Sequence, residues 1–383
     1  MLVREFLRWI DTAPTPRRVE AVGALVRAFA REQEPRQKEA LEAALTVLLD
    51  DSAPEVRQAL AATLALDEKA PRHLVLHLAG DQPLVAEPIL ARSAVLLDSE
   101  LVDFVAAGVP RLQRAIARRP RVSRAVSAAI AEVGTRGALV ALASNPNARI
   151  AAASFARMAE RHGAEPRVRD ALFARPDLPM FVRQDLIARL SDALGNLVML
   201  RAWLPDDRAR AMTREACDKA TIGLLAAAAP EDVPALVAHL RASGQLTTTL
   251  LIRAVCGGHL AFLEAALASL SGLPERRIYP LLAEGNESSL RALFGRCRLP
   301  VRSHGAFLAA ILAWRDLGRS GAPENPVRYA RAMVERTLVR YQAHGADGID
   351  DLRAMLRRFA ADAARDAALS YVAEGGDEPA AAA

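Results

Sequence analysis

A proline-centred phrase near the start of the chain, DSAPEVRQAL at residues 51–60, constrains the fold more than any other feature. Proline is favoured in the first turn of a helix, where its missing N–H leaves no hydrogen bond unmade. We therefore expect one helix to end near Asp51 and the next helix to begin at Pro54. Val56 and Leu60 lie four residues apart, so they share one face of that helix and predict its buried side.

Looser copies of this phrase recur at Pro83, Pro120, Pro146 and Pro176, at intervals of roughly 26 to 37 residues. Each interval has room for two helices of about 10 to 14 residues joined by short turns. One such hairpin cannot bury its apolar face alone, whereas stacked neighbours can. The alternating apolar and polar runs typical of strands are absent, so the sequence predicts an all-α solenoid of about 20 stacked helices.

Three stripes of large apolar residues at helical spacing support this prediction. The stripes are Leu41, Leu45 and Leu48; Leu260, Leu263, Leu267 and Leu270; and Phe307, Ile311 and Trp314. Steps of three and four residues are typical of the buried face of a helix. We interpret these residues as core positions rather than as contacts to a cofactor.

Breaks in the helical pattern divide the chain into five predicted segments. Pro205 and the two aspartates after it interrupt the pattern near residue 204, and a stretch rich in Gly and Pro occupies residues 318–326. The predicted segments are N-terminal repeats at 1–204, helical repeats of the same or a second module at 205–317, a linker at 318–326, a helical hairpin at 327–372 and a disordered tail at 373–383. The hairpin is either a cap on the solenoid, which we favour, or a docking element for a partner.

The composition points to a protein of the cytoplasm. The longest uncharged runs, such as residues 303–314, are shorter than the roughly 20 residues that span a bilayer, so no membrane insertion is expected. Charges interrupt the first nine residues, which is typical of an amphipathic helix and not of a signal peptide. Cys217, Cys256 and Cys297 form no C-x-x-C pair, so they predict neither a zinc site nor a disulfide framework.

The positive charge of the chain comes almost entirely from arginine. The 50 basic residues include only three lysines, at positions 38, 69 and 219. Arginine is the residue of choice for recognising carboxylates and phosphates, so this bias is one sign of an anion-binding surface. The alternative, which we favour, is a GC-rich genome that raises Arg and Ala everywhere.

The best candidate site is a run of six arginines that we call the basic ridge. Its members are Arg111, Arg114, Arg118, Arg119, Arg121 and Arg124, and no acidic residue lies between Phe104 and Ala131. The ridge is a solvated face, a binding surface for an acidic protein or a binding surface for nucleic-acid phosphates. Aromatic residues, which would stack on bases, do not interleave with these arginines.

Signals for catalysis, cofactors or metals are weak. His73 and His77 lie four residues apart on a predicted helix, but they have no companion Glu, and we interpret them as packing or surface histidines. The chain lacks a P-loop, a G-x-S-x-G elbow and the His-Glu dipeptides that bind iron in some helical-repeat enzymes. We therefore predict no catalytic, cofactor-binding or metal-binding residue. A helical-repeat DNA glycosylase is a remote alternative, because the aromatic residues it needs are few and far apart.

Two stretches resemble known families. The phrase around Pro54, with Val56 and Arg57, resembles the second helix of a HEAT-type repeat. The stretch 244–302 is similar to a bacterial domain-of-unknown-function family (DUF2336) found mainly in alphaproteobacteria. The similarity lies in Gly244-Gln245-Leu246, the run 250–254, His259-Leu260-Ala261-Phe262, Ala266-Leu267-Ala268 and the run 270–274. The resemblance extends to about Asp316 and implies a helical-repeat fold, and it carries no activity and no catalytic residues.

These observations leave two functional hypotheses. The first is a non-enzymatic scaffold or adaptor that binds a protein partner on the surface of the stacked helices. The second is a nucleic-acid-binding protein that uses the basic ridge, with an affinity that falls steeply with salt.

Overall fold

The computed structural model describes residues 6, 9–10, 12–200, 205–320, 325–343 and 350–375. Within these residues there are 21 α-helices, three short 3-10 helices and no strand, and helices that are neighbours in sequence pack on one another. The all-α, solenoid-like prediction is therefore confirmed. The chain divides into two compact units, which we call unit 1 (Met1–Val182) and unit 2 (Arg183–Ala383).

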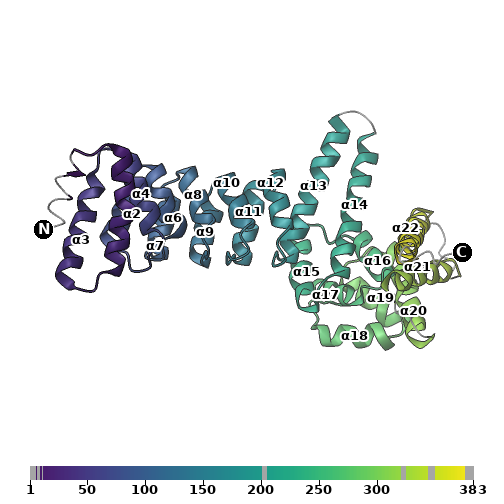
Figure 1. Ribbon diagram of the computed structural model, residues 1–383. Helices are drawn as coiled ribbons and strands as arrows, with labels where there is room; N and C mark the ends of the chain where they lie inside the picture. Colours follow the sequence, from purple (N-terminus) through teal and green to yellow (C-terminus); the bar gives the residue numbers. More distant parts are fainter. Residues whose placement is uncertain are drawn as a thin grey trace, which may run out of the picture. The chain divides into compact units, whose positions relative to one another are not determined.

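Unit 1 is a regular two-layered stack (Figure 1). Its helices are α2 (Thr15–Arg31), α3 (Pro35–Val47), α4 (Pro54–Leu64), α5 (Arg72–Ala79), α6 (Pro83–Arg92), α7 (Asp98–Ala106), α8 (Pro110–Ala117), α9 (Arg124–Val133), α10 (Arg136–Ala143), α11 (Ala152–His162) and α12 (Pro166–Phe173). The even-numbered helices from α2 to α12 pack each on the next, and α7, α9 and α11 do the same in the other layer. Each helix thus buries its apolar face against the neighbouring repeat.

The proline-centred phrase folds as its sequence predicts. Helix α4 begins at Pro54, and Val56 and Leu60 have no exposed surface. Pro83 begins α6 in the same way. The other three prolines differ, because Pro120, Pro146 and Pro176 lie in the loops that precede α9, α11 and α13 and not at the helix starts. A residue before proline is biased away from the helical conformation, so these X-Pro pairs keep the loops extended.

A ladder of polar side chains links those three loops. Arg119 donates from Nη1 and Nη2 to the carbonyl oxygens of Leu90 and Ser93, at 2.7 and 2.5 Å. The residues before the other two prolines repeat the arrangement one loop further on. Asn145 Nδ2 donates to Ala117 O and Arg119 O, and Arg175 donates to Asn145 O and Ala148 O. The ladder provides donors to carbonyls at the helix ends and in the loops, and so ties each loop to the preceding one.

Unit 2 is less regular. Its helices are α13 (Met180–Leu200), α14 (Asp206–Ala226), α15 (Val233–Ala242), α16 (Thr248–Cys256), α17 (Leu260–Ser271), α18 (Glu275–Glu284), α19 (Glu287–Arg296), α20 (His304–Ser320), α21 (Pro326–Ala343) and α22 (Asp350–Gly375). Helices α15, α17 and α19 pack in sequence order, but α16 also packs on α20 and α21. The buried Phe294 and Phe307, whose ring centroids are 5.4 Å apart, lie in the contact between α19 and α20.

The C-terminal hairpin packs on the other helices of unit 2. Helix α21 packs on α20, and α22 packs on α21. Gly258, in the loop between α16 and α17, has a φ of +85°, and an added Cβ would lie 2.3 Å from the ring of Tyr329 on α21. Only glycine allows both this backbone conformation and this close approach.

The segment boundaries of the structure differ from those expected from sequence. The division into units falls between Val182 and Arg183, near the start of α13 and before the expected boundary at residue 204. Pro205 lies within unit 2, between the long helices α13 and α14. Helix α20 continues to Ser320, into the expected linker 318–326, and α22 continues to Gly375, into the expected tail. Residues 201–204, 321–324 and 376–383 lie outside the described part of the chain.

Candidate binding sites

The basic ridge does not form one surface. Arg119 is buried and belongs to the loop ladder, so its guanidinium does not face the solvent. Arg111 is paired with Glu87, with 2.5 Å between Nε and Oε2. The remaining four members, Arg114, Arg118, Arg121 and Arg124, are exposed and make no side-chain hydrogen bond or ion pair with any described residue.

Arg121 and Arg124 line an open hollow of about 1070 Å³ between the loops that precede α9 and α11, which we call the arginine hollow. A short parallel bridge holds the two loops together, in which Arg149 N donates to Val122 O at 3.0 Å. The bridge brings a third exposed and unpaired arginine, Arg149, into the hollow. The sequence contained little signal for it, since Arg149 lies three residues after Pro146 whereas Arg121 directly follows Pro120, and the basic ridge as predicted ended at Arg124.

The arginine hollow has few counter-charges of its own. Asp177 also lines it, but this carboxylate is paired with Arg175 of the ladder at 2.7 Å. Asp98 is the other acidic residue of the lining. The N-terminus of α9, which begins at Arg124, adds the positive end of a helix dipole. The hollow therefore offers guanidinium groups and backbone N–H groups to an anion.

The other end of α8 opens onto a second, smaller hollow of about 550 Å³. Here the arginines are mostly engaged: Arg111 pairs with Glu87, Arg136 with Glu165 at 3.0 Å, and Arg161 donates to Ala131 O. Arg114 is the exposed ridge residue on this side. Of the predicted ridge, Arg111 and Arg114 thus line one hollow, Arg121 and Arg124 line the other, and Arg118 and Arg119 line neither.

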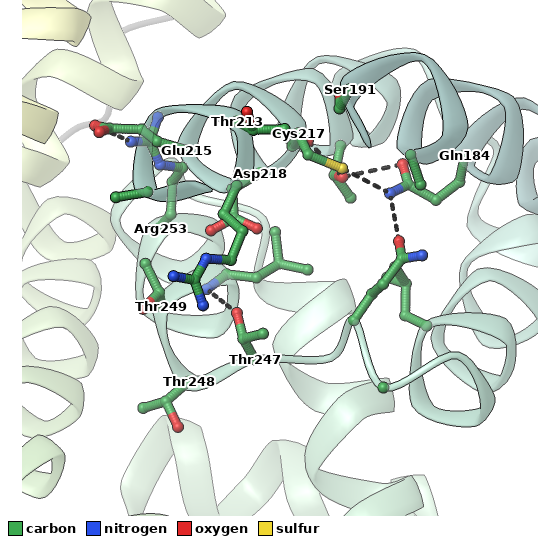
Figure 2. Close-up of a pocket in the computed structure, with 18 of the residues that line it drawn as sticks. Gln184, Ser191, Thr213, Glu215, Cys217, Asp218, Thr247, Thr248, Thr249 and Arg253 are labelled. Atoms are coloured by element: carbon green, nitrogen blue, oxygen red, sulfur yellow. Dashed lines mark hydrogen bonds and ion pairs between the residues drawn. The ribbon is translucent and has the colours of Figure 1, made fainter. Parts of the chain in front are cut away.

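Unit 2 contains a pocket of about 800 Å³, which we call the central pocket (Figure 2). Its walls come from α13, α14, the loop before α16, and α22. One wall is a buried polar network around Gln184 of α13, whose side chain is 1% exposed. Gln184 accepts from Thr221 Oγ1 at 2.9 Å and donates to Gln245 Oε1 at 3.2 Å. These bonds fix the wall, because each group in it has a partner.

Arg253 of α16 forms a second, charged wall. Its guanidinium binds Glu215 at 3.2 Å and Asp362 at 3.3 Å, and it lies over the ring of Phe359, 4.2 Å from the centroid. Glu215 also pairs with Arg358 at 3.6 Å. These contacts join α14, α16 and α22 through charges that largely neutralise one another.

Asp218 lies between the two walls. Figure 2 shows its carboxylate on the pocket side of α14, near the loop of Thr247 and Thr248. No hydrogen-bond donor among the described residues reaches it. Burial raises the pKa of this carboxyl to about 6, and the nearby Arg253 limits the rise. Cys217, its neighbour on α14, also has a raised pKa because of burial, so its sulfur is a neutral thiol.

Both residues of the predicted histidine pair, His73 and His77, are exposed at the surface. His73 Nε2 lies 3.2 Å from Thr46 Oγ1, and Nδ1 lies 3.6 Å from Glu42. Over the described ranges no group of three His, Cys, Asp or Glu side chains is arranged to hold a metal ion. No helix in the part of the chain that the structure describes is long and apolar enough to cross a membrane.

Residues of the central pocket carry no sequence signal. Gln184, Asp218 and Arg253 are separated by more than thirty residues each, in no motif, and their meeting depends on how α13, α14 and α16 pack. The spacing of residues in sequence predicts which side chains share a face of one helix, but it does not predict which side chains of three different helices meet.

Fold and sites together define a helical-repeat protein with a hollow lined by three exposed arginines in one unit and a pocket of mixed polar and apolar lining in the other. The chain belongs to the family described as an uncharacterised protein conserved in bacteria (DUF2336), which matches residues 85–345. The match begins in α6 and extends past the end of α21, so it includes the arginine hollow and most of the central pocket. No curated protein and no solved structure matches the chain.

Proposed function

We propose that this protein is a non-enzymatic adaptor that binds an acidic segment of a partner protein in the arginine hollow of unit 1. The observation that supports the proposal is the set of three exposed arginines, Arg121, Arg124 and Arg149, that share one hollow without ion pairs. Like charges held close together repel, and an anionic ligand relieves that repulsion. Carboxylates also match the planar, two-pronged geometry of the guanidinium group.

The contrast with other arginines of unit 1 strengthens this proposal. Arg57, Arg157 and Arg175 are each engaged by a carboxylate of their own unit. A compositional bias toward arginine explains why the residue is frequent. It does not explain why three unpaired copies gather at the two loops joined by the bridge between Val122 and Ala148.

An acidic protein segment suits the hollow better than nucleic acid does. The two hollows share no lining residue, and most arginines of the smaller one are already engaged, which favours a short anionic segment over a long phosphate backbone. No aromatic residue is among the residues that line either hollow, so neither hollow offers a side chain on which a base could stack. We place this adaptor in the cytoplasm, where its three cysteines would remain reduced.

The test measures binding of a fluorescent acidic peptide, such as a mixed Asp/Glu decamer, by anisotropy. The variant Arg121→Glu/Arg124→Glu/Arg149→Glu should bind at least tenfold more weakly, since each charged contact contributes about 1 kcal/mol or more. The matched control is Arg27→Glu/Arg31→Glu/Arg36→Glu, which changes the net charge equally at exposed positions of α2 and α3.

Two results would contradict the proposal. One is an equal loss of affinity in the control variant, which would mean that only net charge matters. The other is a single-stranded oligonucleotide that binds more tightly than the peptide at the same salt concentration, with a steeper salt dependence. Affinity capture from the native host with the wild type and the hollow variant would then identify the partner that depends on the three arginines.

A further inference from the structure

Unit 2 contains another pocket, which we call the hairpin pocket because both helices of the C-terminal hairpin line it. Its volume of about 460 Å³ falls within the range of known ligand pockets, which is roughly 300–1,000 Å³. Its walls come from the C-terminal part of α14, the loop between α16 and α17, and helices α21 and α22. Arg253 and Phe359 line both this pocket and the central pocket. The proposed function of unit 1 does not depend on either pocket.

Most of the residues that line the hairpin pocket are apolar. Helix α14 contributes Ile222 and Leu225, and α21 contributes Val327, Ala330 and Val334. Removing the apolar surface of a ligand from water against side chains of this kind is favourable. The lining therefore suits a molecule that is itself mainly apolar.

The charged residues of the lining are paired with one another. Lys219 lies 3.5 Å from Asp366 and 3.9 Å from Asp362, and Arg253 lies 3.3 Å from Asp362. The Nε atom of Arg253 has no partner, but it also has almost no accessible surface, so a ligand in the pocket does not reach it. Two cations and two carboxylates thus line the pocket and balance in charge. A charged ligand would lose hydration here and find no unpaired counter-charge.

Two neutral polar side chains of the lining have no partner in the part of the chain that the structure describes. His259 directly follows Gly258, and the ring of Tyr329 packs against Gly258. Neither the imidazole nor the phenol hydroxyl makes a hydrogen bond with another described residue. Burial lowers the pKa of His259 and raises the pKa of Tyr329, so both groups are uncharged above pH 7. They offer hydrogen bonds to a neutral oxygen.

We propose that the hairpin pocket binds an uncharged, mainly apolar small molecule that carries one oxygen function, such as an alcohol or a ketone. Its hydrocarbon part packs against Ile222, Leu225 and Val334. Its oxygen lies at the neutral polar pair, where it accepts a hydrogen bond from the hydroxyl of Tyr329 beside His259. Because α14, α21 and α22 all line the pocket, the bound ligand also joins the C-terminal hairpin to the rest of unit 2.

Three eight-carbon probes of matched length test the charge of the ligand: 1-octanol is uncharged, octanoate is an anion and octylammonium is a cation. Binding to the full chain is measured by isothermal titration calorimetry at pH 7.5. Octanol should bind at least tenfold more tightly than either ion, because a lining of balanced charges does not compensate for the lost hydration of a charge. Equal affinity for the three probes, tighter binding of an ion or no binding of octanol would overturn the proposal.

A variant that fills the pocket locates the site. Gly223 lies within α14 and lines the pocket, and an added Cβ there would meet nothing within 4 Å. Gly223→Trp should therefore occupy the pocket without strain and weaken octanol binding at least tenfold. The matched control is Gly295→Trp in α19, a helical glycine with equally open space that lines neither pocket of unit 2. Unchanged binding by Gly223→Trp, or an equal loss in Gly295→Trp, with intact helical circular-dichroism spectra, would reject the proposal.

A smaller change tests the hydrogen bond to the ligand oxygen. Tyr329→Phe keeps the ring that packs against Gly258 and removes only the hydroxyl, so it should weaken octanol binding about threefold to tenfold. Affinity equal to that of the wild type would contradict the proposed position of the oxygen.

Hydrogen exchange of the wild type needs no variant. Saturating octanol should slow the exchange of amides in α21 and α22, because the ligand joins these helices to α14. Exchange that is unchanged in both helices would show that octanol binds outside the hairpin pocket and would overturn the proposal.

Discussion

Units 1 and 2 are both built from packed helices, but they differ in how far apart in sequence the residues lie that make polar contacts between helices and loops. In unit 1 the ladder of Arg119, Asn145 and Arg175 joins each loop to the preceding one, over 26 to 30 residues. In unit 2, Arg253 binds Asp362 across 109 residues. Contacts between neighbouring repeats produce a surface on which similar loops follow one another. Contacts between residues far apart in sequence bring distant helices together, and a pocket forms between them.

The comparison explains why the two units offer different kinds of site. The bridge between Val122 and Ala148 holds two successive loops side by side, which is how Arg121 and Arg149 come to share the arginine hollow. Helix α22 closes one side of the central pocket after the chain has passed through seven further helices from α14. A surface formed by repeats suits an extended partner, and an enclosed pocket suits a small ligand.

The largest expected effect tests the ladder of unit 1. Arg119→Ala should lower the free energy of unfolding by about 3 kcal/mol, because two buried carbonyls lose their donors and a cavity forms. The measurement is the urea-unfolding transition. The control is the adjacent Arg118→Ala, an exposed position where a change below about 0.5 kcal/mol is expected. Similar losses in the two variants would mean that the ladder does not stabilise unit 1.

A second, smaller effect tests the long-range packing of unit 2. Gly258→Ala should cost about 2 kcal/mol, since alanine is strained at a φ of +85° and its Cβ would collide with Tyr329. Gly244→Ala is the matched control, because its φ of +70° is similar but an added Cβ meets nothing within 4 Å. It should cost only about 1 kcal/mol.

Hydrogen exchange distinguishes the two glycine variants further. In Gly258→Ala the amides of α21 should exchange faster, since the helix loses its close contact with the loop, while Gly244→Ala should leave α21 unchanged. Protection of α21 that is equal in both variants would show that the contact between Gly258 and Tyr329 does not hold the C-terminal hairpin.

The smallest effect has the opposite sign and tests the unpaired carboxyl of unit 2. The pKa of Asp218 is about 6 in the folded protein, against 3.8 for an ordinary aspartate, so the folded state binds the proton more tightly. The ionised carboxylate therefore costs stability above pH 6, and this cost disappears as the pH falls through the interval from 6 to 4. Asp218→Asn should be more stable than the wild type by about 1 kcal/mol at pH 7.5, after allowance for solvent screening.

Urea unfolding of both proteins at a series of pH values measures this difference. The advantage of Asp218→Asn should shrink toward zero near pH 4. A variant that is less stable than the wild type at pH 7.5 would mean that Asp218 has a stabilising partner in the folded protein.

Much of the fold could be predicted because it depends on local rules. Pro54 marks the start of α4, and Leu45, Leu263 and Phe307 of the predicted stripes are buried because helical periodicity sets which residues face the neighbouring helix. The role of Arg119 could not be predicted in the same way. Its sequence neighbours are exposed arginines, and only the position of Leu90 and Ser93 in the folded chain distinguishes it from them.

The sequence by itself determined that the chain is helical, where α4 and α6 begin and which residues of the apolar stripes are buried, because proline geometry and the 3.6-residue period act over a few residues. Only the tertiary structure decided that Arg119 is buried and hydrogen-bonded while Arg121, Arg124 and Arg149 are exposed in one hollow. It also decided that Asp218 and Arg253 line the same pocket. The physical reason is that loop lengths vary between repeats, so contacts between helices follow from packing and not from spacing along the chain.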